Sequence, residues 1–170
     1  MKTLYLMRHS EAETHGPNGD ASRPLTKAGR AAATEVGTML QQAGIGHALV
    51  SSAVRTRQTF ETLGLDCHAE FMDVLYRGGT EDLAQRIGEV DEDVDALLVV
   101  GHSPMIPSFA AELLYATAQR EADQLQCHFP TSTVTVLDVE GPWDDLTSNP
   151  VHLRDIARVS DEQATGCARR

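Results

Sequence analysis

Basic and imidazole side chains directly follow apolar runs at three places in the chain. Arg8 and His9 come after "TLYLM", and His102 comes after "ALLVVG". Either Arg55 or Arg57 could be the cation that follows "ALVSS". Guanidinium groups bind phosphate oxygens in a fork geometry, and a neutral imidazole can attack phosphorus while fixed donors hold the remaining oxygens. Brought together, these residue types could transfer a phosphoryl group through a covalent phosphohistidine.

Apolar runs that alternate with helical patterns indicate how the fold would bring those residues together. Strands are predicted at 3–7, 47–52, 95–100 and 132–139, with an edge strand at 151–159. This alternation predicts an α/β protein with a mainly parallel sheet. In such a sheet the carboxyl ends of the strands and the N-termini of the following helices meet at one edge, where anions bind.

The first predicted helix lies between the first two strands. Thr26 is its expected N-cap, and Gly44 stands where a glycine commonly follows a helix end. Apolar spacing predicts that one face is buried, made of Ala28, Ala32, Val36, Met39 and Ala43.

Three further helices are predicted downstream. One follows Ser52 and stops at Gly64, and the next follows Thr80. The last is expected to begin at Pro104 with Ser103 as its N-cap, because proline at the first helical position needs no backbone N–H.

Composition excludes several classes of function. The formal net charge of −11 argues against nucleic acid and anionic membrane surfaces as partners. No apolar run is long enough for a signal peptide or a membrane span, and Cys67, Cys127 and Cys167 form neither a zinc motif nor a disulfide framework. We therefore expect a cytoplasmic protein of one domain over residues 1–160, with a flexible tail at 161–170.

The order and spacing of the basic motifs resemble the histidine phosphatase superfamily, also called phosphoglycerate mutase-like. Its R-H-G signature appears as Arg8-His9-Ser10, its second arginine as Arg55 in "SSAVRTRQT", and its second histidine as His102 in "GHSP". The likeness is strongest to the short, SixA-like branch of phosphohistidine phosphatases, which also shows "RPLT", here from Arg23. It covers roughly residues 3–140.

The resemblance implies a three-layer α/β/α sandwich with a mostly parallel mixed sheet, one strand of it antiparallel. It implies that His9 is the phosphorylated nucleophile and that His102 is a second catalytic residue. Arg8, Arg55 and His102 would bind the phosphoryl group, and Arg23 would add a contact. The family uses no metal and no cofactor, so neither is expected here.

The sequence departs from the family pattern in two ways. Ser10 replaces the signature glycine. Larger members carry a carboxylate general acid in an inserted segment after their third strand, whereas here "DVLYRGG" offers Tyr76 and Arg77. Asp20 is the first candidate for that acid, and Glu11 is the second.

The missing acid points to the substrate. An alkyl phosphate expels a poor leaving group and usually needs a proton donor, whereas phosphohistidine expels an imidazole. A phosphohistidine carrier protein is therefore the expected partner, and a sugar or glycerate phosphate is the alternative substrate.

Other readings of the motifs fit less well. "LLVVGHSPM" resembles the strand, elbow and helix of an α/β-hydrolase, but Met105 replaces its second glycine and Pro104 removes an oxyanion-hole N–H. Neither Cys67 nor Cys127 begins a C-x5-R loop. A phosphate-binding module without turnover is a further alternative. The other histidines, which fit no metal-ligand spacing, are expected to be structural or on the surface: His15, His47, His68, His128 and His152.

Overall fold

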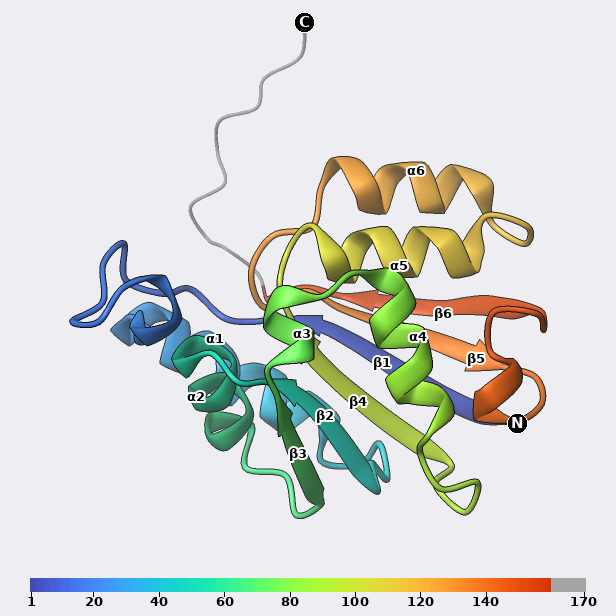
Figure 1. The fold of residues 1–170 in the computed structure, drawn as a ribbon, viewed down its shortest axis with the longest axis horizontal. Helices are drawn as coiled ribbons and strands as arrows, with labels where there is room; N and C mark the ends of the chain where they lie inside the picture. Colours follow the sequence, from blue (N-terminus) through green and yellow to red (C-terminus); the bar gives the residue numbers. More distant parts are fainter. Residues whose placement is uncertain (160–170) are drawn as a thin grey trace, which may run out of the picture.

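The computed structural model describes residues 1–159, which form one mixed sheet between two helical layers (Figure 1). Within these residues the sheet has six strands in the order β3-β2-β4-β1-β5-β6. They are β1 (Lys2–Arg8), β2 (His47–Ser51), β3 (His68–Met72), β4 (Ala96–Gly101), β5 (Val134–Val139) and β6 (Val151–Ala157).

Strand directions confirm the predicted mixed sheet. β1 pairs in parallel with β4, β4 with β2, and β2 with β3. β5 is antiparallel to both of its neighbours, β1 and β6, so among the described strands only β5 runs against the others. The four strands that the apolar runs predict are present, and 151–159 contains the predicted edge strand as β6.

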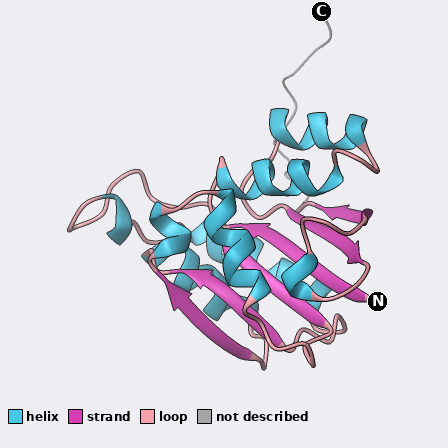
Figure 2. Cartoon of the chain, turned by 45° about the vertical axis from the view of Figure 1, so that its right-hand side comes forward, coloured by secondary structure: helices cyan, strands magenta, loops and turns pink. Residues whose placement is uncertain are grey.

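Helices cover both faces of the sheet, as the cyan ribbons on either side of the magenta strands show in Figure 2. One face carries α1 (Lys27–Leu40) and α2 (Val54–Leu63). The other face carries α3 (Val74–Arg77), α4 (Thr80–Gly88), α5 (Met105–Leu114) and α6 (Gln119–Cys127). Two short 3-10 helices, η1 (Asp20–Ser22) and η2 (Trp143–Asp145), lie in loops.

The side chains of β1 explain the two cores. Because successive strand residues point to opposite faces, Leu4 and Leu6 pack toward α4 and α5, while Tyr5 and Met7 pack toward α1 and α2. All four residues are buried, which is why the strand reads as a continuous apolar run.

The predicted buried face of α1 is wrong at most positions. Thr26 caps the helix as expected, since its hydroxyl accepts the Gly29 N–H at 2.9 Å, but Met39 is 46% exposed. A Cβ on Gly37 would lie 2.2 Å from the Leu63 carbonyl oxygen, so the glycines allow a close backbone approach that apolar spacing ignores. The helix is therefore rotated about its axis relative to the prediction. Its buried residues are Gly29, Ala33, Val36, Gly37 and Leu40.

Two other helix details differ from the predictions. α1 ends at Leu40, and Gly44, with φ of 66°, follows a short turn and not the last helical residue. At the start of α5 the N-cap is Pro104, and no side-chain cap is formed, so the prediction of Ser103 as N-cap is wrong. The backbone itself starts this helix, because the Ile106 N–H donates to the His102 carbonyl oxygen.

The sequence patterns missed β3, α3 and α6. β3 is half exposed, and α6 buries only Ala122 and Leu125, so neither carries a strong periodic signal. None of the helices in residues 1–159 combines the length and the hydropathy needed to cross a bilayer. The single domain over 1–160 stays a prediction, and the predicted tail at 161–170 lies outside the described residues.

We expect Gly37→Ala to destabilise the protein. Helix propensity alone would favour alanine by about 1 kcal/mol, but the new Cβ would meet backbone of α2, and overpacking costs about 1–3 kcal/mol. Chemical denaturation should therefore show a lower free energy of unfolding. Gly46→Ala is the matched control, because the nearest atom to its Cβ is 4.0 Å away. A variant at Gly37 as stable as the parent would contradict the proposed close packing.

Candidate active site

The parallel pairing of β1 and β4 creates the centre of the site. Arg8 lies opposite Gly101 in the register, and the His9 N–H donates to the Gly101 carbonyl oxygen at 2.9 Å. The His9 and His102 rings, one after each strand, have centroids 5.4 Å apart. The sheet therefore brings the two predicted histidines together at the edge where parallel strands end.

His9 is held as a neutral imidazole. It is 7% exposed, and its Nδ1 lies 2.7 Å from the Ser10 carbonyl oxygen, which can only accept a hydrogen bond. Nδ1 therefore carries the proton, and Nε2 keeps its lone pair. Burial lowers the pKa of His9 to about 4, and the charges of Arg55 and Arg8 add smaller effects in the same direction. The hydrogen bond to Ser10 acts in the opposite direction. At neutral pH this imidazole can act as a nucleophile.

Ser10, which stands in the glycine position of the signature, points into the protein. Its side chain is fully buried, its hydroxyl accepts that of Ser132 at 2.7 Å, and its N–H donates to the Thr59 hydroxyl at 3.0 Å. Thr59 in turn donates to the Arg55 carbonyl oxygen. The His9 loop is thus anchored to α2 and to the segment before β5, a role of Thr59 and Ser132 that sequence reasoning missed.

The structure distinguishes the two arginines of α2. Arg55 is 5% exposed, and its Nη1 and Nη2 donate to the backbone and side-chain oxygens of Asp20 at 3.0 and 3.1 Å. Arg57 is exposed, donates to the Ser52 carbonyl oxygen, and stacks over Phe71. Arg55 and Arg57 are only two residues apart, so the sequence motif did not distinguish them. In the structure only Arg55 faces the histidines.

Arg8 adds a second cation, which is half-buried. Its Nη1 donates to the Phe129 carbonyl oxygen at 2.9 Å. Burial and the charge of Arg55 lower the pKa of Arg8, and both arginines also lower that of His9. Two like charges therefore lie close enough to oppose each other, an arrangement that an anion between them would stabilise.

Asp20, the predicted proton donor, is an ionised carboxylate in this structure. It accepts the Tyr76 O–H at 2.7 Å, the Arg23 Nε–H at 2.9 Å and the Arg55 Nη2–H at 3.1 Å. The Tyr76 hydrogen bond first, and then the nearby guanidinium groups, lower the pKa of Asp20 to about 2 against an opposing effect of burial. A group with that pKa has no proton to donate near pH 7.

His102 is the second imidazole of the site. Its Nε2 lies 2.7 Å from the Ser51 hydroxyl, and its ring centroid lies 5.6 Å from that of Tyr76. Burial first, and then the charge of Arg55, lower the pKa of His102 to about 3. Within residues 1–159 its buried Nδ1 finds no hydrogen-bond partner, and the same holds for Nε of Arg8 and Arg55. These three nitrogen atoms therefore have hydrogen-bonding capacity that the described part of the protein does not use.

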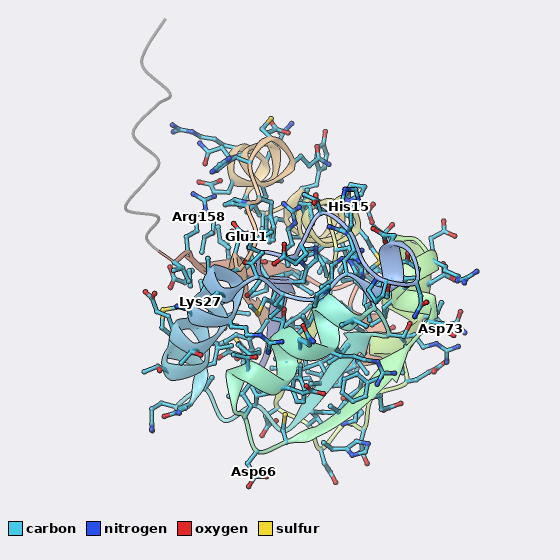
Figure 3. All side chains as sticks on the ribbon, turned by 90° about the vertical axis from the view of Figure 1, so that its left-hand side faces the viewer. Glu11, His15, Lys27, Asp66, Asp73 and Arg158 are labelled. Carbon is cyan, nitrogen blue, oxygen red and sulfur yellow. The ribbon has the colours of Figure 1, made fainter. Side chains whose placement is uncertain are left out.

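The remaining candidates lie farther out. The Glu11 carboxylate accepts the hydroxyl of Thr26, the N-cap of α1, at 2.7 Å, and Figure 3 shows it on the same side of the molecule as Lys27 and Arg158. Arg23 binds Asp20 and the Glu13 carbonyl oxygen, in the loop that covers the site. A groove of about 410 Å³ opens beside His102, and its lining includes Tyr76, Gly79, Thr80, Ser103, Pro104 and Glu112.

Known proteins resemble this chain in both sequence and fold. The family described as the histidine phosphatase superfamily (branch 1) matches residues 4–76. An uncharacterised protein of Mycobacterium tuberculosis, MT1313, is 33% identical over 144 residues, which cover 82% of this chain and 91% of that protein.

Solved structures show the same likeness. A candidate phosphohistidine phosphatase SixA from Nakamurella multipartitia has a TM-score of 0.85 and 33% identity, covering 92% of this chain and 95% of that one. The protein histidine phosphatase SixA complexed with tungstate shares the fold, with a TM-score of 0.74 and 24% identity over 91% of this chain and 95% of its own. The chain therefore belongs to the histidine phosphatase superfamily, in its SixA-like branch, and is a phosphatase.

Proposed function

We propose that this phosphatase removes the phosphoryl group from phosphohistidine on a partner protein, without a metal ion, through a phosphohistidine intermediate on His9. The observation that carries the proposal is that the Asp20 carboxyl group is ionised. The site combines a buried neutral imidazole with several cations, but the Asp20 carboxyl group, which is bonded to Arg55, has a pKa of about 2. Such a site can bind and transfer a phosphoryl group, yet Asp20 cannot protonate a poor leaving group.

The first step follows from the tautomer of His9. Nε2 attacks phosphorus with its lone pair, while Nδ1–H stays bonded to the Ser10 carbonyl oxygen and orients the ring. The bond from phosphorus to the substrate nitrogen breaks, and the ring leaves as a neutral imidazole when its other nitrogen already carries a proton. In the second step water attacks the phosphoryl group on His9 and releases orthophosphate and the free imidazole.

Arg8, Arg55 and His102 hold the oxygens of the phosphoryl group, and Arg23 adds a contact from the loop. In the structure the Asp20 carboxylate sits on Arg55, where it supplies negative charge to the buried guanidinium. A phosphoryl oxygen carries the same charge and accepts the same N–H groups. The incoming substrate therefore displaces Asp20 from Arg55.

The leaving group selects phosphohistidine over an alkyl phosphate. An alkoxide must be protonated as it leaves, and a placed acid contributes about 10²–10⁴-fold in rate. Imidazole, whose conjugate acid has a pKa of about 6.5, leaves far more readily. The likeness to the candidate SixA of Nakamurella multipartitia supports the same substrate class. The groove beside His102 would also accept a small alkyl phosphate, so a sugar or glycerate phosphate is the second candidate.

A phosphohistidine-bearing carrier domain should be a better substrate than any sugar phosphate, as judged by kcat/KM for the two kinds of substrate in EDTA. Asp20→Asn should retain carrier turnover within about 10-fold, because an ionised Asp20 donates no proton. The same variant should bind orthophosphate more tightly, since a competing anion is gone. Preference for an alkyl phosphate, with collapse of that activity in Asp20→Asn, would instead identify Asp20 as a working acid and overturn the assignment.

His9 should carry the phosphoryl group during turnover. Mixing the enzyme with a labelled phosphohistidine peptide and quenching without acid should trap acid-labile, base-stable phosphate on the protein. His9→Ala should trap none and lose on the order of 10³-fold in rate or more. His128→Ala is the control, because His128 is exposed and lies outside the site. Substantial activity in His9→Ala would rule out the intermediate.

Arg55→Ala should lower the rate by on the order of 10²-fold or more, because it removes a buried donor pair from the phosphoryl oxygens. Arg57→Ala is the matched control, because Arg57 is an arginine of the same helix whose side chain points away from the site. It should keep nearly full activity. Thermal unfolding of both variants separates catalysis from folding, and equal loss of activity in the two variants would contradict the assignment of Arg55 to phosphoryl binding.

A further inference from the structure

A second group of histidine and carboxylate side chains lies at the other end of the sheet from the phosphatase site. His47 and His68 are the first residues of β2 and β3, and they are direct partners in the parallel register. Glu70 follows two residues later in β3, on the same face as His68. Figure 3 shows Asp66, just before β3, far from Asp73, which follows the strand on the side of the active site.

We propose that His47, His68 and Glu70 form a zinc-binding site that joins the edge strand β3 to β2. One ligand atom from each residue lies within 4.8 Å of the other two. The imidazole centroids are 5.1 Å apart, and His47 Nε2 lies 2.8 Å from Glu70 Oε1. No sequence spacing pointed to this group, because strand pairing and not a helix or hairpin brings it together.

The ligand types and distances suit zinc. Zn²⁺ binds imidazole nitrogen and carboxylate oxygen at about 2.1 Å, so neighbouring ligand atoms in a tetrahedral site are about 3.4 Å apart. The observed spread is somewhat larger, and rotation of the exposed His68 and Glu70 side chains would close it. Two imidazoles and one carboxylate leave the fourth position to water.

Burial and charge at this place also favour a cation. The side chain of His47 is only 14% exposed, so one ligand is already fixed in position. Asp66 adds negative charge beside β3, in a protein whose net charge is −11. The role of the metal would be structural. In residues 1–159 the strand β3 pairs with β2 alone, so cross-linking their first residues would hold the free edge of the sheet.

Zinc titration of the full chain tests the proposal. We would use the His9→Ala variant at pH 7.5, so that the active-site histidines do not compete for the metal. Calorimetry with zinc chloride should show one equivalent bound through this site. At a free zinc concentration about 100 times the dissociation constant, the unfolding midpoint should rise by about 5 °C. Amide hydrogen exchange in β3 should slow at the same time.

Single substitutions identify the ligands. His68→Gln and Glu70→Gln should each weaken zinc binding by about 10-fold or more, which reduces the rise in the unfolding midpoint by about half or more at the same zinc concentration. Both residues are exposed, so the folded state should persist. In the otherwise unchanged enzyme, His68→Gln should leave phosphatase activity as it was, because the group lies at the opposite end of the strands.

His152→Gln is the matched control. His152 Nε2 also lies near a glutamate, 3.5 Å from Glu140 Oε1, but no second histidine joins that pair. Its substitution should not change zinc affinity. Cys67→Ser should likewise bind normally, because Cys67 is not among the three residues whose ligand atoms lie together. Zinc affinity that is unchanged in His68→Gln, or no binding at 100-fold molar excess of zinc, would overturn the proposal.

Discussion

The parallel pairing of β1 with β4 is the constraint on which the site depends. The backbone hydrogen bond from His9 to the Gly101 carbonyl oxygen joins the two histidine motifs directly. The Ser132 N–H donates to the His9 carbonyl oxygen from the other side, so the residue that follows β1 is held between β4 and the segment before β5. A slip of one residue in either pairing would turn His9 to the other face of the sheet and separate the imidazoles.

At that edge of the sheet the Asp20 carboxylate balances part of the positive charge of the arginines. Asp20 receives hydrogen bonds from Arg23, Arg55 and Tyr76, which fix the loop over the site and keep the carboxylate ionised. Burial first, and then the charge of Arg55, lower the pKa of both imidazoles and keep them neutral. One electrostatic arrangement thus accounts for two imidazoles that are neutral near pH 7 and for the lack of a proton on Asp20.

Secondary structure could be predicted where burial leaves a strong period. β1 and β4 are buried on both faces and read as continuous apolar runs, and α2 ends at Leu63, just before Gly64 in its left-handed conformation. The buried face of α1 could not be predicted from apolar spacing, because Gly29 and Gly37 contribute backbone contacts and no apolar side chain. The half-exposed β3 escaped detection for the opposite reason: this strand buries too few side chains to impose a pattern.

The sequence by itself determined the α/β class, the family resemblance, and the presence of two histidines and several arginines at strand ends. Local order is enough for this, since each motif is contiguous with the strand that carries it. Only the tertiary structure decided that Arg55 faces the histidines while Arg57 stacks on Phe71, and that Asp20 is ionised by its neighbours. It alone also placed His47 beside His68. Side-chain direction, pKa and cross-strand contact all depend on residues distant in the chain, and no local pattern contains them.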